Sequence, residues 1–368
     1  IQTFSNSCLT STTSGLVLYN QFEDGIGSNI ATSLIGPKGI LYNVNATSDW
    51  VLGSEMDCCA PPASALNFDG SNDRVNLGNS ISALFNPLNK ITLEAWVKPT
   101  SAFGNGAIVG NYNSNNHTQF LLRRDGNRYA FMVNDGTGNK TVQTSAGTAT
   151  TNVWQHVAGV WDGSQIRIYI NGILKGATTG VTGSSFANTS NNVGIGHSLN
   201  SQHFNGSIDE VRIWSVARSQ CDINTFRNGE IADSSLGLVA NYHFNQGHPA
   251  TANPYVTNLT DASGNAHTGT LTGFALTGTV SNWVTPGGVI SGSSNSLSPL
   301  AIGATVTNSV ICLGASTQLN GTGAHVYSWT GGRINNVPFS PTQSASYTVT
   351  GTNTLSACTN TAAISITV

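Results

Sequence analysis

The chain has 368 residues, which is enough for two domains, and its formal net charge is −3. Only 8% of the residues are charged, and 39% are hydrophobic. A balance this close to neutral excludes the basic surface that nucleic acid binding needs, and the apolar content argues against a disordered chain. No apolar run approaches the roughly 20 residues that span a bilayer, so we expect no membrane-spanning segment.

A segment near the N-terminus recurs late in the chain. Residues 15–25 read GLVLYNQFEDG and residues 237–247 read GLVANYHFNQG, an ungapped match with identical Gly, Leu, Val, Phe and final Gly. Each copy is typical of a strand that ends in a turn. A spacing of about 220 residues is too long for a solenoid repeat. We therefore predict that the copies are edge pieces that bracket one sandwich.

Strand-like runs separated by turn residues fill the region between the two copies. They are residues 65–68, 91–98, 107–110, 119–124, 129–133, 154–161, 165–170 and 207–214. Asp-Gly and Asn-Gly pairs, the commonest chemistry of tight hairpins, accompany many of them. Residues 218–228 are an exception, because Ser219 can cap a short helix there. This pattern predicts an all-β sandwich.

The last part of the chain predicts a second, smaller domain. Residues 287–299 are rich in Gly, Ser and Pro and read as a linker, and residues 300–368 contain short Thr-rich strands. With residues 1–14 as an N-terminal tail, the main domain is expected to span 15–286. Because the chain opens on Ile1 and closes on a strand-like run, we expect the native protein to be longer.

The six cysteines favour disulfides over metal binding, since none lies in a C-x-x-C motif or at zinc-ligand spacing. We predict a bridge between Cys312 and Cys358, which lie at opposite ends of the C-terminal segment; closing that loop would stabilise it by about 4 kcal/mol. Adjacent cysteines rarely bond each other, so one of Cys58 and Cys59 is expected to join Cys8 and the other Cys221. Disulfides indicate an oxidising compartment, and hence a secreted or cell-surface protein.

Four stretches of the main domain resemble a known family. They are ALNFDGSNDRV at 65–75, ITLEAWVK at 91–98, WQHVAGVW at 154–161 with IYING at 168–172, and GSIDEVRIW at 206–214. Their sequences and order resemble the laminin-G-like, concanavalin-A-like jelly rolls of bacterial surface proteins. The turn DASGN at 261–265 also resembles the turn that accompanies that family's opening strand, although here it follows the second copy and the first copy lacks it.

The C-terminal segment resembles a second family. Residues 311–314, 327–331, 347–352 and 358–361 are similar to the immunoglobulin-like repeats of large secreted bacterial adhesins. The two resemblances together imply a jelly-roll sandwich followed by a small Ig-like β-sandwich, at a bacterial cell surface or outside the cell.

Some jelly rolls of the first family hydrolyse glycans, which requires two carboxyl groups about 5–10 Å apart in one cleft. Asp209 and Glu210 are consecutive, so in a regular strand they point to opposite faces. Glu94 stands alone between Leu93 and Ala95. We therefore predict that the chain is not an enzyme and has no catalytic residues.

The first resemblance also implies a calcium ion that joins the turn of the opening strand to an acidic residue of the last strand. Carried over by motif, the ligands are Asp209 with Glu23 and Asp24. The second copy offers residues 245–247 instead, with Asp261 near in sequence. The alternative is that Asp209 pairs with Arg212 or accepts hydrogen bonds from turn amides.

Aromatic residues within the family motifs are expected to lie in the core, namely Trp96, Trp154, Trp161 and Trp214. A glycan would instead meet rings and amides of exposed loops. The predicted binding residues are Asn111, Tyr112, Asn113, His117, Arg124, His197 and His203. The alternative interpretation is that these loops are simply solvated turns.

The sequence predicts a non-catalytic extracellular adhesin that binds a polysaccharide or glycoprotein, with the C-terminal domain as a spacer. Two alternatives stay open. The chain could be a structural subunit of a self-assembling surface fibre or layer, with copies of itself as partners, or an ancillary module of a larger secreted enzyme.

Overall fold

The computed structural model describes residues 64–101, 104–111, 119–181, 183, 185–187, 191–198, 202–231, 235–249, 251–290, 292–293 and 300–368. Nearer the N-terminus it describes the backbone of three strands, β1 (Tyr19–Gln21), β2 (Ile30–Ile35) and β3 (Gly39–Ile40). These strands form an antiparallel sheet of their own in the order β1-β2-β3.

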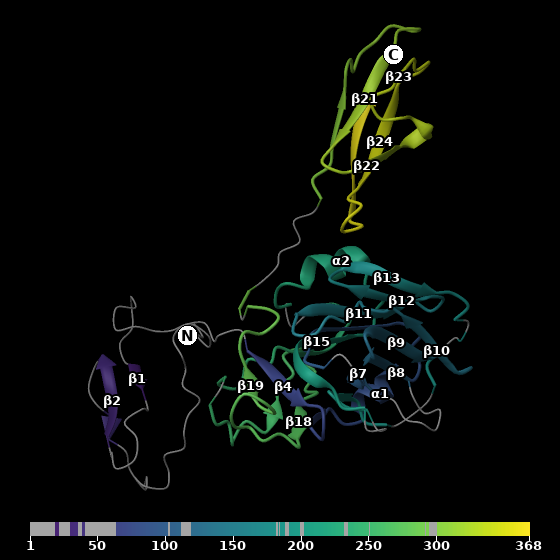
Figure 1. Cartoon of the computed structure of the whole chain (residues 1–368). Helices are drawn as coiled ribbons and strands as arrows, with labels where there is room; N and C mark the ends of the chain where they lie inside the picture. The colour runs from purple at the N-terminus through teal and green to yellow at the C-terminus, as the bar shows by residue number, and fades with distance from the viewer. Residues whose placement is uncertain are drawn as a thin grey trace.

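The main body is a sandwich of two antiparallel eight-stranded sheets (Figure 1). Sheet 1 has the order β10 (Asn139–Gln143), β9 (Arg128–Asn134), β8 (Phe120–Asp125), β7 (Asn105–Gly110), β14 (Gly194–Ile195), β5 (Arg74–Asn76), β18 (Gly269–Thr272) and β17 (Asn258–Leu259). Sheet 2 has the order β13 (Ile173–Thr178), β12 (Ile166–Ile170), β11 (Gln155–Trp161), β6 (Ile91–Pro99), β15 (Asn205–Trp214), β4 (Ala65–Asp69) and β19 (Trp283–Val284). The last strand of sheet 2, β16 (Leu238–Tyr242), pairs with β15 beside the end of β4. All eight strand segments expected between the two copies are confirmed, with ends that differ by at most two residues.

Alternation along the strands of sheet 2 separates a core face from an outer face. In β6, Leu93, Ala95 and Val97 enter the core between the sheets, so Thr92 and Glu94 point outward with the other even-numbered residues. The core is rich in aromatic rings that meet edge to face, such as Trp161 and Phe186, whose centroids lie 4.6 Å apart. Because one face is apolar and the other polar, the register of each strand is fixed.

Segments that follow β15 cover part of the outer face of sheet 2. They include α2 (Gln220–Phe226), whose N-terminus is capped reciprocally by Ser219 and Asp222, which confirms the expected helix and its cap. The other helix, α1 (Ser80–Phe85), lies at one end of the sandwich (Figure 1). Within the described residues, no helix is long and apolar enough to cross a membrane.

The second copy of the repeat forms the edge of the sandwich. Gly237 adopts a positive φ of 81°, Phe244 is fully buried in the core, and a Cβ added to Gly247 would lie 2.1 Å from the indole of Trp283. The turn at 261–265 then covers the free edge of β16, since the Asp261 carboxylate accepts the Asn241 amide at 2.9 Å. Three of the positions that the two copies share, Gly237, Phe244 and Gly247, therefore have a structural role at this edge of the sandwich. Of the first copy only the backbone of β1 is described, and β1 pairs with β2 in a separate three-stranded sheet, so the prediction that this copy is also an edge of the sandwich is wrong for the described strand.

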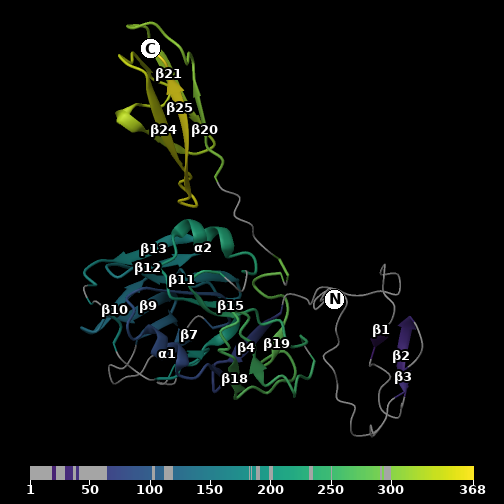
Figure 2. The ribbon, with the colours of Figure 1, turned by 180° about the vertical axis from the view of Figure 1, so that it is seen from behind.

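The C-terminal module has two small sheets. One has the order β20 (Gly303–Val306), β21 (Thr317–Thr322) and β23 (Pro338–Phe339), and the other β22 (Val326–Trp329), β24 (Ala345–Thr352) and β25 (Thr359–Ile366). A short 3-10 turn, η1, lies at Thr330–Gly332. Figures 1 and 2 show that this module stands above α2, with the C-terminus at its far end. Its core is small: Leu319, Trp329, Tyr347, Val349 and Ile366. The Ig-like assignment and the domain limits remain predictions.

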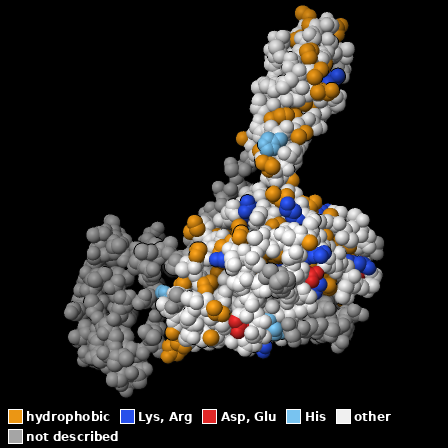
Figure 3. All heavy atoms as spheres, in the orientation of Figure 1, with side chains coloured by type: hydrophobic (Ala, Val, Ile, Leu, Met, Phe, Trp, Pro, Cys, Tyr) orange, Lys and Arg blue, Asp and Glu red, His pale blue; other side chains and the backbone are white. Residues whose placement is uncertain are grey.

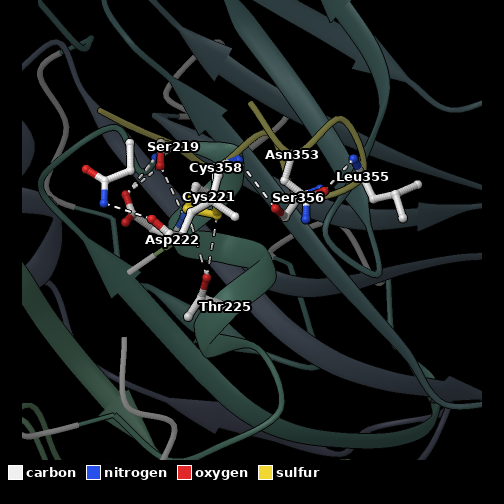
Figure 4. Close-up of a disulfide and its surroundings, with 10 residues drawn as sticks. Ser219, Cys221, Asp222, Thr225, Asn353, Leu355, Ser356 and Cys358 are labelled. Atoms are coloured by element: carbon white, nitrogen blue, oxygen red, sulfur yellow. Dashed lines mark hydrogen bonds between the residues drawn. A yellow bond between two sulfur atoms is a disulfide. The ribbon is translucent and has the colours of Figure 1, made fainter. Parts of the chain in front are cut away.

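The predicted Cys312–Cys358 bridge is wrong, because Cys358 is bonded to Cys221 on α2 and Cys312 is free and exposed (Figure 4). Cys358 immediately precedes β25, whereas the segment that carries Cys312 meets the other end of this strand, where the Ile311 amide donates to the Thr367 carbonyl. About nine residues of extended chain, roughly 25–30 Å, therefore separate the two sites, and a disulfide needs Cα atoms within about 7 Å. The predicted partnership of Cys221 with Cys58 or Cys59 is also wrong, because Cys221 is bonded to Cys358. Cys8, Cys58 and Cys59 lie outside the described residues.

The surface matches the composition. Figure 3 shows few charged side chains on the face turned to the viewer, where neutral atoms predominate. This agrees with the low share of charged residues, 8%, in the sequence.

Candidate functional site

Polar side chains of three neighbouring strands form a row across the outer face of sheet 2. Ser207 on β15 is the register partner of Lys98 on β6 and of Asn67 on β4. None of the three points into the core, because their neighbours Val97, Phe68 and Ile208 do. The strands thus place an ammonium, a hydroxyl and an amide side by side on a rigid surface.

This row lines a pocket with a volume of about 200 Å³. Trp154, just before β11, and the segment that follows β19 close its sides, joined by a hydrogen bond of 3.2 Å from Trp154 Nε1 to the Pro286 carbonyl. The full lining is Asn67, Lys98, Thr100, Asn152, Trp154, Ser207, Thr279, Val284, Thr285 and Pro286. Trp154 was expected in the core, but it is only partly buried and lies at this pocket. Trp96, Trp161 and Trp214 are buried as expected.

The floor of the pocket is held in place by hydrogen bonds. Asn67 Nδ2 donates to Ser207 Oγ at 3.2 Å, and Asn67 Oδ1 accepts the amide of Ser281 at 3.2 Å. The Ser207 hydroxyl proton is left to donate to a ligand. An indole, amides and hydroxyls in one concavity are the groups that stack on a sugar ring and bond its hydroxyls.

Farther along the same outer face, a β-bulge gathers buried charges. Asp209 is opposite Trp96 and Arg212 is opposite Glu94, so two residues of β15 face one of β6, and Glu210 has a positive φ of 49°. The bulge interrupts the alternation that was expected to separate Asp209 from Glu210. Both carboxyls consequently lie beneath the segments that cover this face.

Glu94 is the centre of the first group of charges. Its Oε1 accepts Arg218 Nη1 at 2.7 Å, and His156 Nε2 lies 3.4 Å from its Oε2 without hydrogen-bond geometry. Burial alone would raise the pKa of Glu94, but the charge of Arg218 holds it well below its usual range. Burial lowers the pKa of His156, against the opposing effect of Glu94.

Glu210 is the centre of the second group. It pairs with Arg212 Nη2 and with His243 Nδ1, each at 2.7 Å. Burial would raise the pKa of Glu210, but Arg212 and then His243 lower it. Burial would lower the pKa of His243, but the hydrogen bond to Glu210 and the charges of Glu210 and Glu230 together raise it. Glu210, Glu230 and His243 offer ligand atoms that all lie within 4.8 Å of one another, which is a possible metal-binding group.

Asp209, the predicted calcium ligand, is bonded to backbone amides. Its Oδ2 accepts the amides of Gly288 at 2.7 Å and Val289 at 3.2 Å, and its Oδ1 accepts that of Glu210 at 2.8 Å. Burial, and then the neighbouring charge of Glu210, raise its pKa well above the usual range. The other predicted ligands, Glu23 and Asp24, lie outside the described residues.

The predicted binding loop does not contribute to the pocket. Asn111 and Arg124 are 1% and 3% exposed, and Asn111 Nδ2 donates to Gln119 Oε1 at 2.8 Å, so neither side chain is open to a ligand. Tyr112, Asn113 and His117 lie outside the described residues. His197 and His203 do come together, with ring centroids 4.6 Å apart, but beside β14 of sheet 1. Burial, then His203 and Arg74, lower the pKa of His197 to about 4.

Sequence reasoning missed the residues that line the pocket. Lys98 and Ser207 stand in the motifs, and alternation alone places them on the outer face, opposite Val97 and Ile208. What the sequence does not reveal is that the chain after β19 returns beside Trp154 and encloses them, because that contact joins residues 132 positions apart.

Comparison with known proteins agrees with this architecture. Residues 69–224 match the family model of the concanavalin A-like lectin/glucanases superfamily. Pappalysin-1 of Mus musculus is 24% identical over 181 residues, which are 45% of this chain and 11% of that protein, so the chain spans a small part of its length.

Three solved structures are similar to part of this chain. A candidate carbohydrate-binding protein of Bacteroides ovatus has 23% identity and a TM-score of 0.45, covering 58% of this chain and 59% of that one. A sialidase carbohydrate-binding module of Ruminococcus gnavus, bound to α2,3-sialyllactose, has 18% identity and a TM-score of 0.36 over 44% and 94%. A heptameric pentraxin of Limulus polyphemus has 18% identity and a TM-score of 0.35 over 45% and 81%. The match of residues 69–224 to the concanavalin A-like lectin/glucanases superfamily model agrees with the sandwich of two sheets that these residues help to form.

Proposed function

We propose that the chain is a non-catalytic carbohydrate-binding protein and that the pocket beside Trp154 is its binding site. The observation that carries this proposal is the composition of the pocket: an indole and several amide and hydroxyl groups line one pocket on the outer face of a sheet. Pockets that enclose drug-sized ligands measure about 300–1,000 Å³. A pocket of about 200 Å³ suits one sugar unit of a longer chain.

The positions of the carboxyl groups support a non-catalytic function. Hydrolysis requires two carboxyl groups that reach the same glycosidic bond. Asp209 and Glu210 are each 1% exposed and Glu94 is fully buried. Asp209 and Glu94 are bonded to segments that cover the sheet, and Glu210 pairs with Arg212, whose guanidinium donates to the carbonyls of Phe226 and Gly229 in the covering segment. The pocket lining contains no Asp or Glu. These charges are therefore assigned to holding the covering segments on the sheet.

An extracellular location follows from the same proposal. A disulfide between α2 and the C-terminal module is expected of a protein made in an oxidising compartment. The ligand is then an extracellular polysaccharide or the glycan of a glycoprotein, and the C-terminal module is a spacer that the disulfide fixes to the binding domain. The adhesin function rests on this arrangement.

Calcium binding by Asp209 with Glu23 and Asp24 is a separate proposal. The hydrogen bonds that Asp209 accepts from backbone amides already satisfy both of its oxygens, which weakens it. Thermal unfolding in 5 mM CaCl₂ and in EDTA tests it: a shared Tm contradicts calcium binding.

The binding proposal is tested on a glycan array with the full chain and two variants. Trp154→Ala removes the stacking surface and should abolish binding to every glycan that the unmodified chain retains. Tyr255→Ala is the matched control, because Tyr255 is a 73% exposed aromatic side chain that is not part of the pocket. Equal binding by the Trp154→Ala variant would contradict the proposal.

A second candidate is an ancillary, substrate-binding module of a larger secreted enzyme. It is favoured by the match to a short part of pappalysin-1, a much longer protein. The same pocket would serve this function, so the two candidates differ in what the remainder of the native protein contains. A catalytic domain in the full-length gene product would favour the second.

A further inference from the structure

Lys98 is the one charged residue among those that line the pocket. The other lining residues are neutral: amides, hydroxyls, an indole, a valine and a proline. The chain has only 14 Lys and Arg residues, so an ammonium in the lining of the candidate site is a specific feature of the site.

The charge of Lys98 has no partner in the described part of the chain. The ion pairs there involve other basic residues: Arg123, Arg167, Arg212, Arg218, His156 and His243. No described side chain or carbonyl accepts a hydrogen bond from its ammonium, although Lys98 is partly buried. An ammonium in this position attracts an anion more strongly than one on an open surface, because the pocket walls displace water.

The nearest acidic residue along the same face does not neutralise this charge. Asp209 lies diagonally across from Lys98, since Ser207 is opposite Lys98 and Asp209 is opposite Trp96. The Asp209 carboxyl is 1% exposed and is turned to the amides of Gly288, Val289 and Glu210. It is therefore committed beneath the covering segment and separate from the pocket.

We infer that the pocket selects acidic sugars, with the carboxylate or sulfate group of one sugar unit bound by Lys98. The inference rests on the proposed function and names its ligand class. Trp154 supplies a stacking surface that any pyranose ring can use, and Ser207 and Asn67 lie beside Lys98 in the row that meets ring hydroxyls. These groups do not distinguish a uronic acid from a neutral sugar, so Lys98 is the specificity-determining residue.

The test measures affinity for ligand pairs that differ only in the anionic group. Isothermal titration calorimetry with the full chain compares oligogalacturonides with their carboxyl-reduced counterparts, and a sulfated galactan with the same polymer after desulfation. A charge-assisted hydrogen bond predicts about 10- to 100-fold tighter binding of at least one acidic ligand than of its neutral partner. Raising the salt concentration should reduce this ratio, because ions screen a partly exposed charge.

Two substitutions assign the preference to Lys98. Lys98→Gln should reduce the ratio of acidic to neutral affinity to about one, whereas Lys98→Arg should restore most of the preference. Circular dichroism of both variants checks that the fold is intact. Retention of the preference in the Lys98→Gln variant would overturn the inference.

The outcomes separate the inference from the proposed function. One outcome is that Trp154→Ala abolishes binding but the unmodified chain shows no preference for acidic ligands, either in these pairs or on the glycan array. This outcome overturns the inference and leaves the proposed binding site standing. Absence of any glycan binding by the unmodified chain overturns both.

Discussion

The disulfide between α2 and the C-terminal module leads to a prediction that separates two cysteine pairings. Replacing Cys221 by Ser removes a bond that closes a loop with a sequence separation of 137 residues. On the chain-entropy model a loop of that length corresponds to about 5 kcal/mol of stability. The loop includes β16 to β19 and most of the C-terminal module. We expect Cys221→Ser to lower the free energy of unfolding by about 2–5 kcal/mol.

The matched control is Cys312→Ser, which replaces an exposed, unpaired thiol. A substitution of this kind changes stability by about 0.5 kcal/mol or less. Urea unfolding monitored by Trp fluorescence compares the two variants with the unmodified chain. A large loss for Cys312→Ser and none for Cys221→Ser would refute the assignment.

Peptide mapping tests the pairing without any substitution. Trypsin cleaves after Arg218, Arg227 and Arg333, and no other Lys or Arg follows Arg218. The three cysteines of the described residues therefore fall in separate peptides, 219–227, 228–333 and 334–368. Without reductant, the structure predicts that peptide 219–227, with Cys221, remains joined to peptide 334–368, with Cys358. A linked 228–333 and 334–368 pair would show the Cys312–Cys358 bridge instead and would refute the reasoning from β25.

The buried charges and the repeat yield three further predictions. Glu94→Gln should destabilise the chain by about 3–5 kcal/mol in urea unfolding, because Arg218 is left buried without its counterion, and a loss below about 1 kcal/mol would contradict this. The lowered pKa of Glu94 stabilises the fold at pH values above 4.5, the ordinary pKa of Glu, and this contribution is lost as the pH falls. The raised pKa of His243 stabilises the fold fully below pH 6.5, the ordinary pKa of His, and this contribution is lost as the pH rises. Urea midpoints from pH 3 to pH 9 should therefore pass through a maximum, and a flat profile would count against both assignments. Gly247→Ala should cost about 1–3 kcal/mol, since the added Cβ meets the Trp283 indole, and an unchanged Tm would show that this contact is wrong.

Strand positions in the sandwich were predictable from the sequence because its register depends on local patterning. Segments such as 91–98 alternate an apolar with a polar face, and dipeptides such as Asn171-Gly172 supply the two positive φ values, 51° and 78°, of the turn between β12 and β13. The capped helix α2 was predictable for the same reason. These features depend on residues close together in the chain.

The site was less predictable because it depends on contacts between distant segments and on one irregularity. Trp154 belongs to a family motif and was assigned to the core, but it lies just before β11 and lines the pocket, where its indole donates to the Pro286 carbonyl. The bulge at Glu210 brings consecutive carboxyls to one covered face, which no alternation rule anticipates. The prediction of the cysteine pairing was wrong for a similar reason, because the sequence around a cysteine does not show which distant segment the fold brings next to it.

The most direct test of the carbohydrate-binding site is a crystal structure of the full chain soaked with an oligosaccharide that it retains on an array. The account predicts density for one sugar ring stacked on Trp154, with its hydroxyls within hydrogen-bond distance of Ser207 and an acidic substituent at Lys98. A sugar bound at any other surface, with this pocket empty, would contradict it.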